Sequence, residues 1–318
     1  MVLAYHRVLP KDALRRQSVQ AGMYVLDRVF DQHMIFLKRN FTVLSFQQLL
    51  DLWKKDQWNA QDRYCVITFD DGWLDNYHHA YPILKRHDIP ATIFLPIDFV
   101  GTHEWFWPDQ VACLLNGVKE SHARREDGKE IKLLLARHLK KETCAMVQVD
   151  LRQESGIDQI IEQCKDLPIG QIRELITALA AVRRVSLPQD RVIVNWEEVR
   201  EMSQHGISFG SHSCSHRILT TIRSEDVSQE LVESRRVLMA QKVNYVPVFC
   251  YPNGNSDPYI QRQVQICGYE AAVSVQAGVE GRTPENQYAI RRVGIHNDVT
   301  STLPLFSFRL FGPLPGSA

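Results

Sequence analysis

The feature of this sequence that most constrains its fold is the alternation of short apolar segments with segments of helical periodicity. Several of the apolar segments are rich in β-branched residues, which is typical of buried strands. We predict strands at residues 2–5, 64–69, 91–95, 207–212, 246–252, 270–275 and 290–296. Strands that are joined by helices through short connections form parallel sheets. The pattern therefore predicts an α/β fold, a distorted parallel (β/α)7-type barrel with a helical insertion, and not an antiparallel sandwich.

One long stretch interrupts this alternation. Residues 102–190 are mostly helical in pattern and contain the charged loop HARREDGKE. We predict one discontinuous barrel domain of residues 1–101 and 191–300, a helical insertion at 102–190 and a C-terminal tail at 301–318. The insertion is expected to cap the barrel mouth, and the alternative is a separate helical domain that only decorates the fold. The tail is apolar and Pro-rich, so it either packs on the barrel or meets a partner.

Length and charge narrow the functional classes. The chain has 318 residues, of which 44% are hydrophobic and 23% charged, as in ordinary globular proteins. Lys plus Arg and Asp plus Glu both number 37, so the balanced charge gives no reason to expect nucleic acid or an anionic membrane surface as a partner.

The location of the protein is also an expectation from sequence. The seven cysteines are scattered, which favours free thiols over a disulfide framework. The sequence shows neither a signal peptide nor an apolar run of about 18 residues. We therefore expect a cytoplasmic protein without a transmembrane segment, and the alternatives are a peripheral membrane location or a leader upstream of Met1. The sequence does not indicate the oligomeric state.

Two carboxylates follow the predicted strand at 64–69. Asp70 and Asp71 stand next to each other and precede Gly72. Carboxylates at the end of a buried strand need a cation or hydrogen bonds, and a turn at Gly72 would aim both of them inward. The alternative is that one of them caps the helix that follows.

Two histidines mark the end of the predicted strand at 207–212. His212 and His216 can reach one metal ion from a helical turn or a tight loop, although such pairs also occur by chance. The carboxyl ends of parallel strands meet at the barrel mouth, so these histidines converge with Asp70 and Asp71. Two histidines and one carboxylate with open positions form a catalytic metal site and leave the second carboxylate free to act as a base.

A third strand ends in the turn Pro252–Asn253–Gly254. One interpretation is a tight turn without further function. The other is a backbone N–H that is aimed at a developing oxyanion.

These motifs resemble those of a known family. TFDDG (residues 68–72) and SHSCSH (residues 211–216), followed by a strand with a proline turn, are similar to the polysaccharide deacetylase family, which is carbohydrate esterase family 4 with the NodB-homology domain. The resemblance covers about residues 1–100 and 195–298. AYHRV (residues 4–8) and RRVGIHND (residues 291–298) resemble the branch that contains exopolysaccharide-modifying deacetylases.

The resemblance implies a role for each motif residue. Asp71, His212 and His216 would bind a divalent metal, usually zinc, with cobalt, nickel or manganese as alternatives. The metal would hold a water and the amide carbonyl, and Asp70 would take the proton of that water. The backbone N–H of Asn253 would help to hold the oxyanion.

A protonated histidine must deliver a proton to the leaving amine. The family's late motif implies His296 for this role, and the alternative is a surface histidine. The family often has an Arg two residues before the turn's Pro252, where this chain has Cys250, and a Tyr after that Pro, where it has Asn253. Our hypothesis is that Arg292 orients Asp70 instead, and the alternative is a surface arginine.

Two further residues are expected near the same mouth. His6 ends the first strand and would bind substrate, support a metal ligand or make a structural hydrogen bond. Tyr251, beside Pro252, would stack on a sugar ring.

The sequence thus predicts a metal-dependent hydrolase of carbon–nitrogen bonds that are not peptide bonds. Its substrate would be an N-acyl, in particular N-acetyl, amino sugar in a saccharide or glycan precursor. One alternative is a deacylase of another N-acyl amide, such as a formamide sugar or a small acylated amine. Another is a carbohydrate-binding pseudoenzyme, against which the complete motif set argues.

Overall fold

The structure is a computed structural model that describes residues 1–15, 19–20, 22–120, 125–139, 150–151 and 153–313. The chain divides into two compact units. The first consists of Met1–Arg15, Ala21–His103 and Arg191–Ala318, and the second consists of Arg16–Gln20 and Glu104–Asp190. Each unit has its own core, as the contacts below show.

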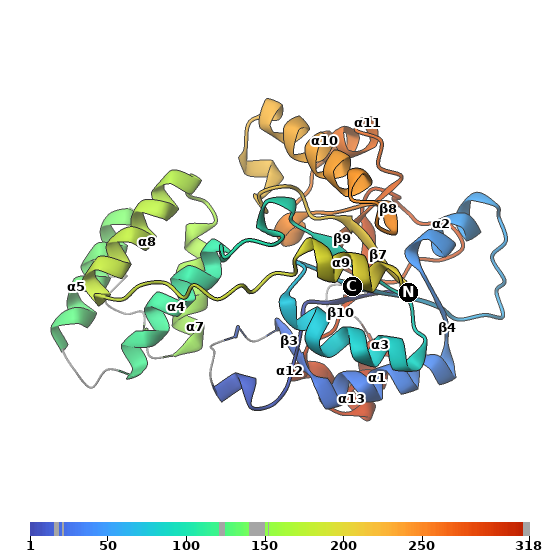
Figure 1. Ribbon diagram of the computed structural model, residues 1–318, viewed down its shortest axis with the longest axis horizontal. Coiled ribbons are helices and arrows are strands. Elements are labelled where there is room, and N and C mark those ends of the chain that lie inside the picture. Colours follow the sequence, from blue (N-terminus) through green and yellow to red (C-terminus); the bar gives the residue numbers. More distant parts are fainter. Residues whose placement is uncertain (16–18, 21, 121–124, 140–149, 152, 314–318) are drawn as a thin grey trace. The chain divides into compact units, whose positions relative to one another are not determined.

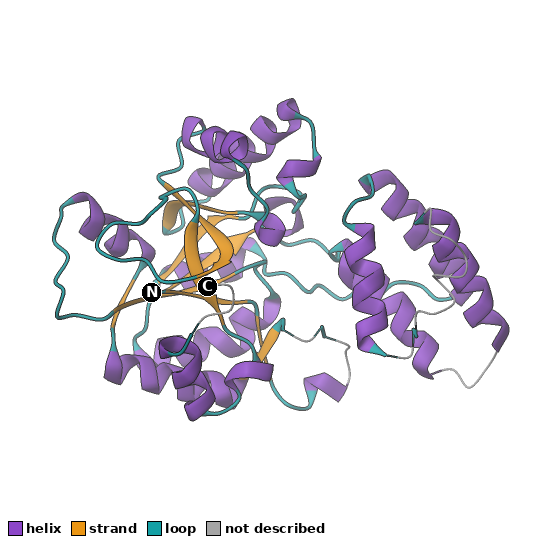
Figure 2. Cartoon of the chain, turned by 180° about the vertical axis from the view of Figure 1, so that it is seen from behind, coloured by secondary structure: helices purple, strands orange, loops and turns teal. Residues whose placement is uncertain are grey.

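The first unit is built on a closed barrel of seven parallel strands within the described residues. Around the ring the order is β1, β10, β9, β8, β7, β6 and β5, and β5 pairs back with β1. Figure 2 shows these strands at the centre of the unit, with helices around them. This architecture confirms the predicted (β/α)7 barrel. The strands are β1 (Val2–Tyr5), β5 (Tyr64–Phe69), β6 (Ala91–Leu95), β7 (Ile207–Ser211), β8 (Tyr245–Cys250), β9 (Ala271–Ala277) and β10 (Ile290–Gly294).

The burial of these strands explains their sequence pattern. Every residue of β1, β5, β6 and β7 is buried. Because strands of a parallel barrel are covered on both faces, they read as continuous apolar runs and not as an alternation of apolar and polar residues. β1 closes the ring, since it pairs in parallel with β5 on one side and with β10 on the other.

Three short strands lie outside the ring. β4 (Thr42–Leu44) pairs with the first half of β5, and β2 (Arg7–Leu9) pairs with β3 (Tyr24–Leu26) in a separate two-stranded sheet. Each has three residues, which is too short for a hydrophobic period to predict it from sequence.

Helices of the first unit cover the barrel (Figure 1). They are α1 (Asp27–Asn40), α2 (Phe46–Lys54), α3 (Tyr81–His87), α9 (Trp196–Ser203), α10 (Ser224–Ala240), α11 (Pro258–Ile266), α12 (Asn297–Thr300) and α13 (Leu303–Phe311).

One helix differs from its predicted form. The sequence predicts a single helix from Asn76 to His87, but Asn76–Ala80 forms a π-helical turn that precedes α3. The backbone N–H of Tyr81 bonds the carbonyl of Asn76 across this turn. Pro82 explains the widening, because it has no N–H and its ring would clash with the carbonyl four residues earlier.

The C-terminal tail packs on the barrel unit as far as the structure describes it. Phe306 and Leu310 of α13 are buried, and the ring of Phe306 stacks on His33 of α1 at 3.7 Å between centroids. Figure 1 shows α13 beside α1. Residues 314–318 of the predicted tail lie outside the described residues.

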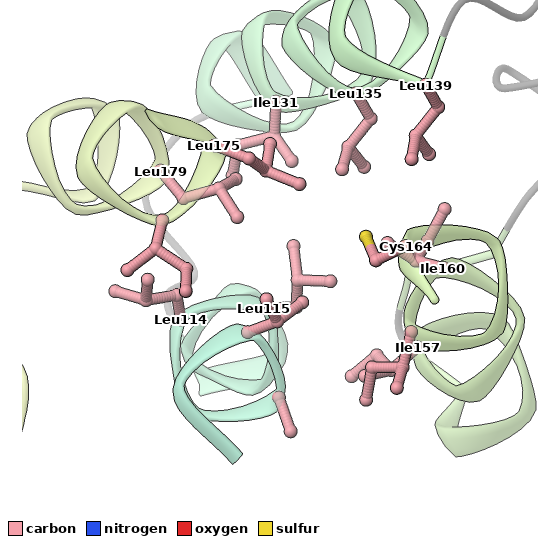
Figure 3. Close-up of a cluster of buried hydrophobic side chains, with 14 of the residues drawn as sticks. Leu114, Leu115, Ile131, Leu135, Leu139, Ile157, Ile160, Cys164, Leu175 and Leu179 are labelled. Atoms are coloured by element: carbon pink, nitrogen blue, oxygen red, sulfur yellow. The ribbon is translucent and has the colours of Figure 1, made fainter. Parts of the chain in front are cut away.

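The second unit is helical, as the pattern at 102–190 predicts. Apolar side chains from α4 (Trp107–Glu120), α5 (Arg125–His138), α7 (Glu154–Cys164) and α8 (Ile169–Arg183) point toward one another and form one core (Figure 3).

None of the helices in the described part of the chain combines the length and the apolar character that a membrane span requires.

Candidate metal centre and active site

The chain turns sharply after β5. Asp71 and Gly72 both have positive φ angles, +74° and +67°. A Cβ on Gly72 would lie 2.6 Å from Cδ2 of Leu95, so the space and the backbone both require glycine. The turn that the sequence predicts at Gly72 is thus present. It directs the side chain of Asp71 toward β7.

Asp71, His212 and His216 come together at the mouth of the barrel. Oδ1 of Asp71 lies 3.3 Å from Nε2 of His212 and 3.2 Å from Nε2 of His216. One ligand atom from each of these side chains lies within 4.8 Å of the other two. Burial raises the pKa of the Asp71 carboxyl, but hydrogen bonds from the two histidines outweigh it and hold this pKa well below its usual value.

The chemistry of these donors fits a divalent metal. Two ligand atoms that each lie about 2.1 Å from a tetrahedral zinc ion are roughly 3.4 Å apart, which is close to the separations above. Nδ1 of His212 lies 2.8 Å from the carbonyl oxygen of Cys250. A carbonyl only accepts hydrogen bonds, so Nδ1 of His212 is the donor in this bond, and Nε2, toward Asp71, is the atom that would bind a metal once it has lost its own proton.

The two histidines lie on a tight loop and not on a helical turn. Ser213 and His216 have positive φ angles, +64° and +55°. The buried carboxylate of Glu230, on α10, holds this loop. It accepts hydrogen bonds from the backbone N–H groups of Cys214 (2.8 Å) and Ser215 (2.9 Å) and from the hydroxyl of Ser215. Glu230 therefore compensates for the unusual backbone of the loop.

Asp70 is buried in a bidentate ion pair with Arg292. Nη1 and Nη2 of Arg292 each donate to one carboxylate oxygen at 2.7 Å. Burial raises the pKa of Asp70, but the Arg292 guanidinium outweighs it and the pKa is lowered. Arg292 thus contacts Asp70, the residue that we expected it to orient. The partners of Asp70 and Asp71 named here are side chains of β10 and of the loop after β7, and this arrangement does not support the helix-cap alternative.

Other strands fix the position of Arg292. Its Nε donates to the carbonyl of Ser274 on β9, and its Nη1 donates to Oγ1 of Thr68 on β5. Its Nη2 lies 3.4 Å from Sγ of Cys250 on β8. Since these partners come from different strands of the ring, Arg292 lies inside the barrel. Cys250 occupies the position where the family often has its arginine, and here a guanidinium reaches the base from β10 instead.

His296, the expected proton donor, and His6, expected near the same mouth, differ in their contacts. Nε2 of His6 lies 3.9 Å from Oδ2 of Asp70, and the His6 side chain is partly exposed. His296 follows β10 and precedes α12, and its Nδ1 lies 3.4 Å from Oδ2 of Asp298. Of these two histidines, His6 is the one that lies beside Asp70, whereas His296 lies beside Asp298.

The turn after β8 has the form that its sequence predicts. Pro252–Gly254 forms a short 3-10 segment, in which Asn253 has a φ angle of +58°. Tyr251 is buried, and its hydroxyl donates to the carbonyl of Tyr288. The prediction that the Tyr251 ring stacks on a sugar is wrong, because the ring is not accessible.

Sequence reasoning missed two residues at this centre. Nε1 of Trp73 donates to Oδ2 of Asp71 at 2.9 Å, and Glu230 holds the histidine loop. Trp73 stands two residues after Asp71, so its nearness in sequence was a usable signal. Glu230 lies in an amphipathic helix and has no such signal.

Comparison with known proteins identifies the family. The polysaccharide deacetylase family model matches residues 57–146 and 176–272. The chain belongs to this family. The protein is therefore a hydrolase that acts on carbon–nitrogen bonds other than peptide bonds.

Two curated relatives are similar in sequence. The polysaccharide deacetylase homologue YxkH of Bacillus subtilis is 21% identical over 295 residues, which cover 92% of this chain and 70% of YxkH. The poly-beta-1,6-N-acetyl-D-glucosamine N-deacetylase of Staphylococcus epidermidis is 31% identical over 110 residues, which cover 32% of this chain and 37% of that enzyme.

Solved structures support the fold. The deacetylase PplD of Streptococcus pyogenes, solved in complex with acetate, has a TM-score of 0.57 at 16% identity and covers 94% of this chain and 92% of its own. IcaB of Ammonifex degensii also has a TM-score of 0.57 at 16% identity, with coverages of 95% and 93%. At this identity the likeness is one of fold.

Proposed function

We propose that this deacetylase-family protein removes the acetyl group from an N-acetylated amino sugar with the help of a divalent metal. The observation that carries the proposal is the convergence of Asp71, His212 and His216 from the ends of β5 and β7, next to Asp70, a candidate base that Arg292 holds. The curated relative from Staphylococcus epidermidis acts on poly-N-acetylglucosamine, which favours N-acetylglucosamine as the sugar.

Asp71, His212 and His216 would hold the metal. When bound, a divalent ion polarises the acyl carbonyl and lowers the pKa of a water. Zinc suits two imidazoles and one carboxylate with open positions, and cobalt, nickel and manganese are alternatives. Because three protein ligands leave room for exogenous ligands, the donor set suits catalysis better than a purely structural role.

Asp70 would act as the general base. Its carboxylate is next in sequence to the ligand Asp71, and the two hydrogen bonds from Arg292 fix the plane of the carboxylate. A fixed base keeps its oxygen aimed at the attacking water and does not have to be reoriented during the reaction. Arg292 also keeps Asp70 ionised in spite of its burial, which a proton acceptor requires.

His6 would deliver the proton to the leaving amine. Two observations support this role: Nε2 of His6 lies 3.9 Å from Oδ2 of Asp70, the proposed base, and the partial exposure of His6 allows proton exchange with solvent. This contact favours His6 over His296, which the resemblance implies. The His6→Ala change should lower kcat by about 10²–10⁴-fold, the range typical of a general acid, whereas His296→Ala should change it by less than about 10-fold. The opposite ranking would return the role to His296.

The backbone N–H of Asn253 stays our proposal for an oxyanion donor. The left-handed conformation of Asn253 belongs to a turn that directly follows β8, whose last residue accepts the His212 hydrogen bond. The cap role of residues 102–190 likewise stays a prediction.

The direct test is acetate release from a defined panel. The panel contains β-1,6-linked and β-1,4-linked N-acetylglucosamine oligomers, the monosaccharide, a nucleotide-linked N-acetylglucosamine and an N-formyl amino sugar. Release from the oligomers supports a polymer substrate, and release only from the nucleotide sugar supports a precursor. Preference for the formyl compound would favour the other N-acyl amide.

Metal dependence is tested on the same panel. We expect release to stop after exhaustive chelation and to return with added zinc or cobalt, while Asp70→Asn stays inactive under both conditions. Release that survives complete metal removal would refute the metal-dependent function. Failure of the metal-loaded wild type on every substrate would instead favour a carbohydrate-binding pseudoenzyme.

A further inference from the structure

We propose that Trp73 is a positioning residue that determines which oxygen of Asp71 faces the two histidines, and that the buried Arg7–Asp75 ion pair keeps Trp73 in place. The inference rests on the proposed metal site, because it concerns how one ligand of that site is presented.

The two oxygens of Asp71 have different partners. Oδ2 accepts a hydrogen bond from Nε1 of Trp73 at 2.9 Å. Oδ1 is the oxygen that lies 3.3 Å and 3.2 Å from the Nε2 atoms of His212 and His216. Trp73 and Asp71 are both buried, at 3% and 5% exposure, so water does not readily replace the indole as a partner of Oδ2.

The different partners of the two Asp71 oxygens affect how many positions this residue would occupy on a metal. A carboxylate that is free to turn can present both oxygens to a metal and occupy two positions. Catalytic sites need open positions for water and substrate. By engaging Oδ2, the indole N–H leaves Oδ1 as the oxygen directed at the histidines, and Asp71 then counts as one ligand.

Arg7, which is paired with Asp75, lies over the face of the indole. The guanidinium carbon of Arg7 lies 4.4 Å from the centroid of the Trp73 ring, which is a cation–π distance. Nε of Arg7 donates to Oδ2 of Asp75 at 2.7 Å, and the backbone N–H of Val8 donates to Oδ1 of Asp75 at 2.9 Å. Both charges are at least nine-tenths buried, so neither side chain has an alternative partner in bulk water.

Backbone bonds fix the segment that carries Trp73 as well. Trp73 forms an isolated antiparallel bridge with Ile193, and the N–H of Leu74 donates to the carbonyl of Val192 at 2.7 Å. Tryptophan suits this position because its side chain has a single N–H donor and a broad face for a cation. Phenylalanine would keep the face and lose the donor.

The Trp73→Phe variant therefore isolates the hydrogen bond. The readout is the visible absorption spectrum of the Co²⁺-loaded protein, which depends on coordination number, together with Co²⁺ affinity from competition with a chelator. We expect the variant's bands to weaken and shift as Asp71 turns, and its affinity to fall about 10-fold or more, as for other residues that orient metal ligands. The matched control is Trp53→Phe, since Nε1 of Trp53 bonds the carbonyl of Gly281 and not a ligand.

A second variant covers the case in which Trp73→Phe does not fold. Asp75→Asn keeps an acceptor for Val8 but loses the charge that holds Arg7, so the spectrum should change in the same direction and by less. An unchanged Co²⁺ spectrum in the folded Trp73→Phe protein, or in Asp75→Asn where that variant replaces it, overturns the inference alone. A wild-type protein that binds no Co²⁺ overturns the inference together with the proposed metal site.

Discussion

Replacement of Arg292 by methionine should destabilise the barrel mainly through the carboxylate that it leaves behind. Asp70 is 3% exposed and Arg292 is 2% exposed, and two hydrogen bonds of 2.7 Å join them. Removal of one partner of a buried ion pair costs about 3–5 kcal/mol of the free energy of unfolding. The arginine stem also fills space, so methionine retains much of the apolar packing and isolates the charge.

A second argument limits the size of this effect. An Asp70 without its cation can take up a proton, which at pH 7 costs about 4 kcal/mol relative to a carboxyl with the usual pKa of about 3.9. We therefore expect Arg292→Met to lose about 3–4 kcal/mol at pH 7. Asp70→Asn combined with Arg292→Met should lose clearly less than the sum of the two single variants, because no charge is then left unpaired.

Urea unfolding followed by circular dichroism and tryptophan fluorescence measures these losses, with metal removed by chelator from all four proteins. Each transition is analysed separately, because a chain with two compact units need not unfold in a single two-state transition. A loss below about 1 kcal/mol for Arg292→Met, or strictly additive losses in the double variant, would refute the view that Arg292 compensates Asp70. Arg292→Lys serves as the control that keeps a charge but loses the bidentate geometry.

Three further predictions follow from groups near the site and at the C-terminal helix. Burial lowers the pKa of His33 to about 4, although its bond to the carbonyl of Thr300 acts in the opposite direction. The unfolded chain therefore binds this proton from about pH 6.5 downward and the folded chain does not, so the His33 contribution lowers the free energy of unfolding by up to about 3 kcal/mol between pH 6.5 and pH 4. His33→Gln should remove this part of the pH dependence in unfolding titrations, and an unchanged slope would contradict the assignment. Glu230→Ala leaves two N–H groups of the histidine loop without their acceptor, so it should lower the free energy of unfolding by about 2–4 kcal/mol and also weaken metal binding. Glu230→Gln keeps an acceptor and should lower the free energy of unfolding by about 1 kcal/mol. Equal losses for the two variants in calorimetry would argue against the hydrogen bonds. Zinc should raise the unfolding temperature of the wild type but not of His212→Ala, as measured by differential scanning fluorimetry, and an equal rise in both would place the metal elsewhere.

The strands were predictable because strands that are buried on both faces have continuous apolar runs in the sequence. YCVITF and ATIFL coincide with β5 and β6, since strands that are covered on both faces hold only apolar and small polar residues. The positions of Asp70, Asp71, His212 and the turn at Pro252 followed from strand ends in the same way, because a parallel barrel collects those ends at one mouth.

The contacts between distant side chains were less predictable. The pairing of Arg292 with Asp70 was a hypothesis that rested only on the argument that a buried base requires an orienting group. The structure shows the two hydrogen bonds that join them. Nothing periodic marks Glu230 as the residue that holds the histidine loop, because its helix reads as an ordinary amphipathic one. The left-handed φ angle of Ser213 was likewise not predictable, because a non-glycine residue seldom adopts it by its own preference.

The closure of the ring between β1 and β10 has a consequence for protein synthesis. Arg292 follows Asp70 by 222 positions, so a ribosome that adds about 5–20 residues per second makes the carboxylate roughly 10–45 s before its partner. Within this interval the nascent chain gains His212 and His216, and it still lacks the cation that allows Asp70 to be buried. The two edges of the growing sheet, at β1 and β9, also stay unpaired until β10 inserts between them. We therefore expect hydrolytic competence to arise late, at the release of nearly the whole chain, and nascent chains stalled before β10 to depend on chaperones.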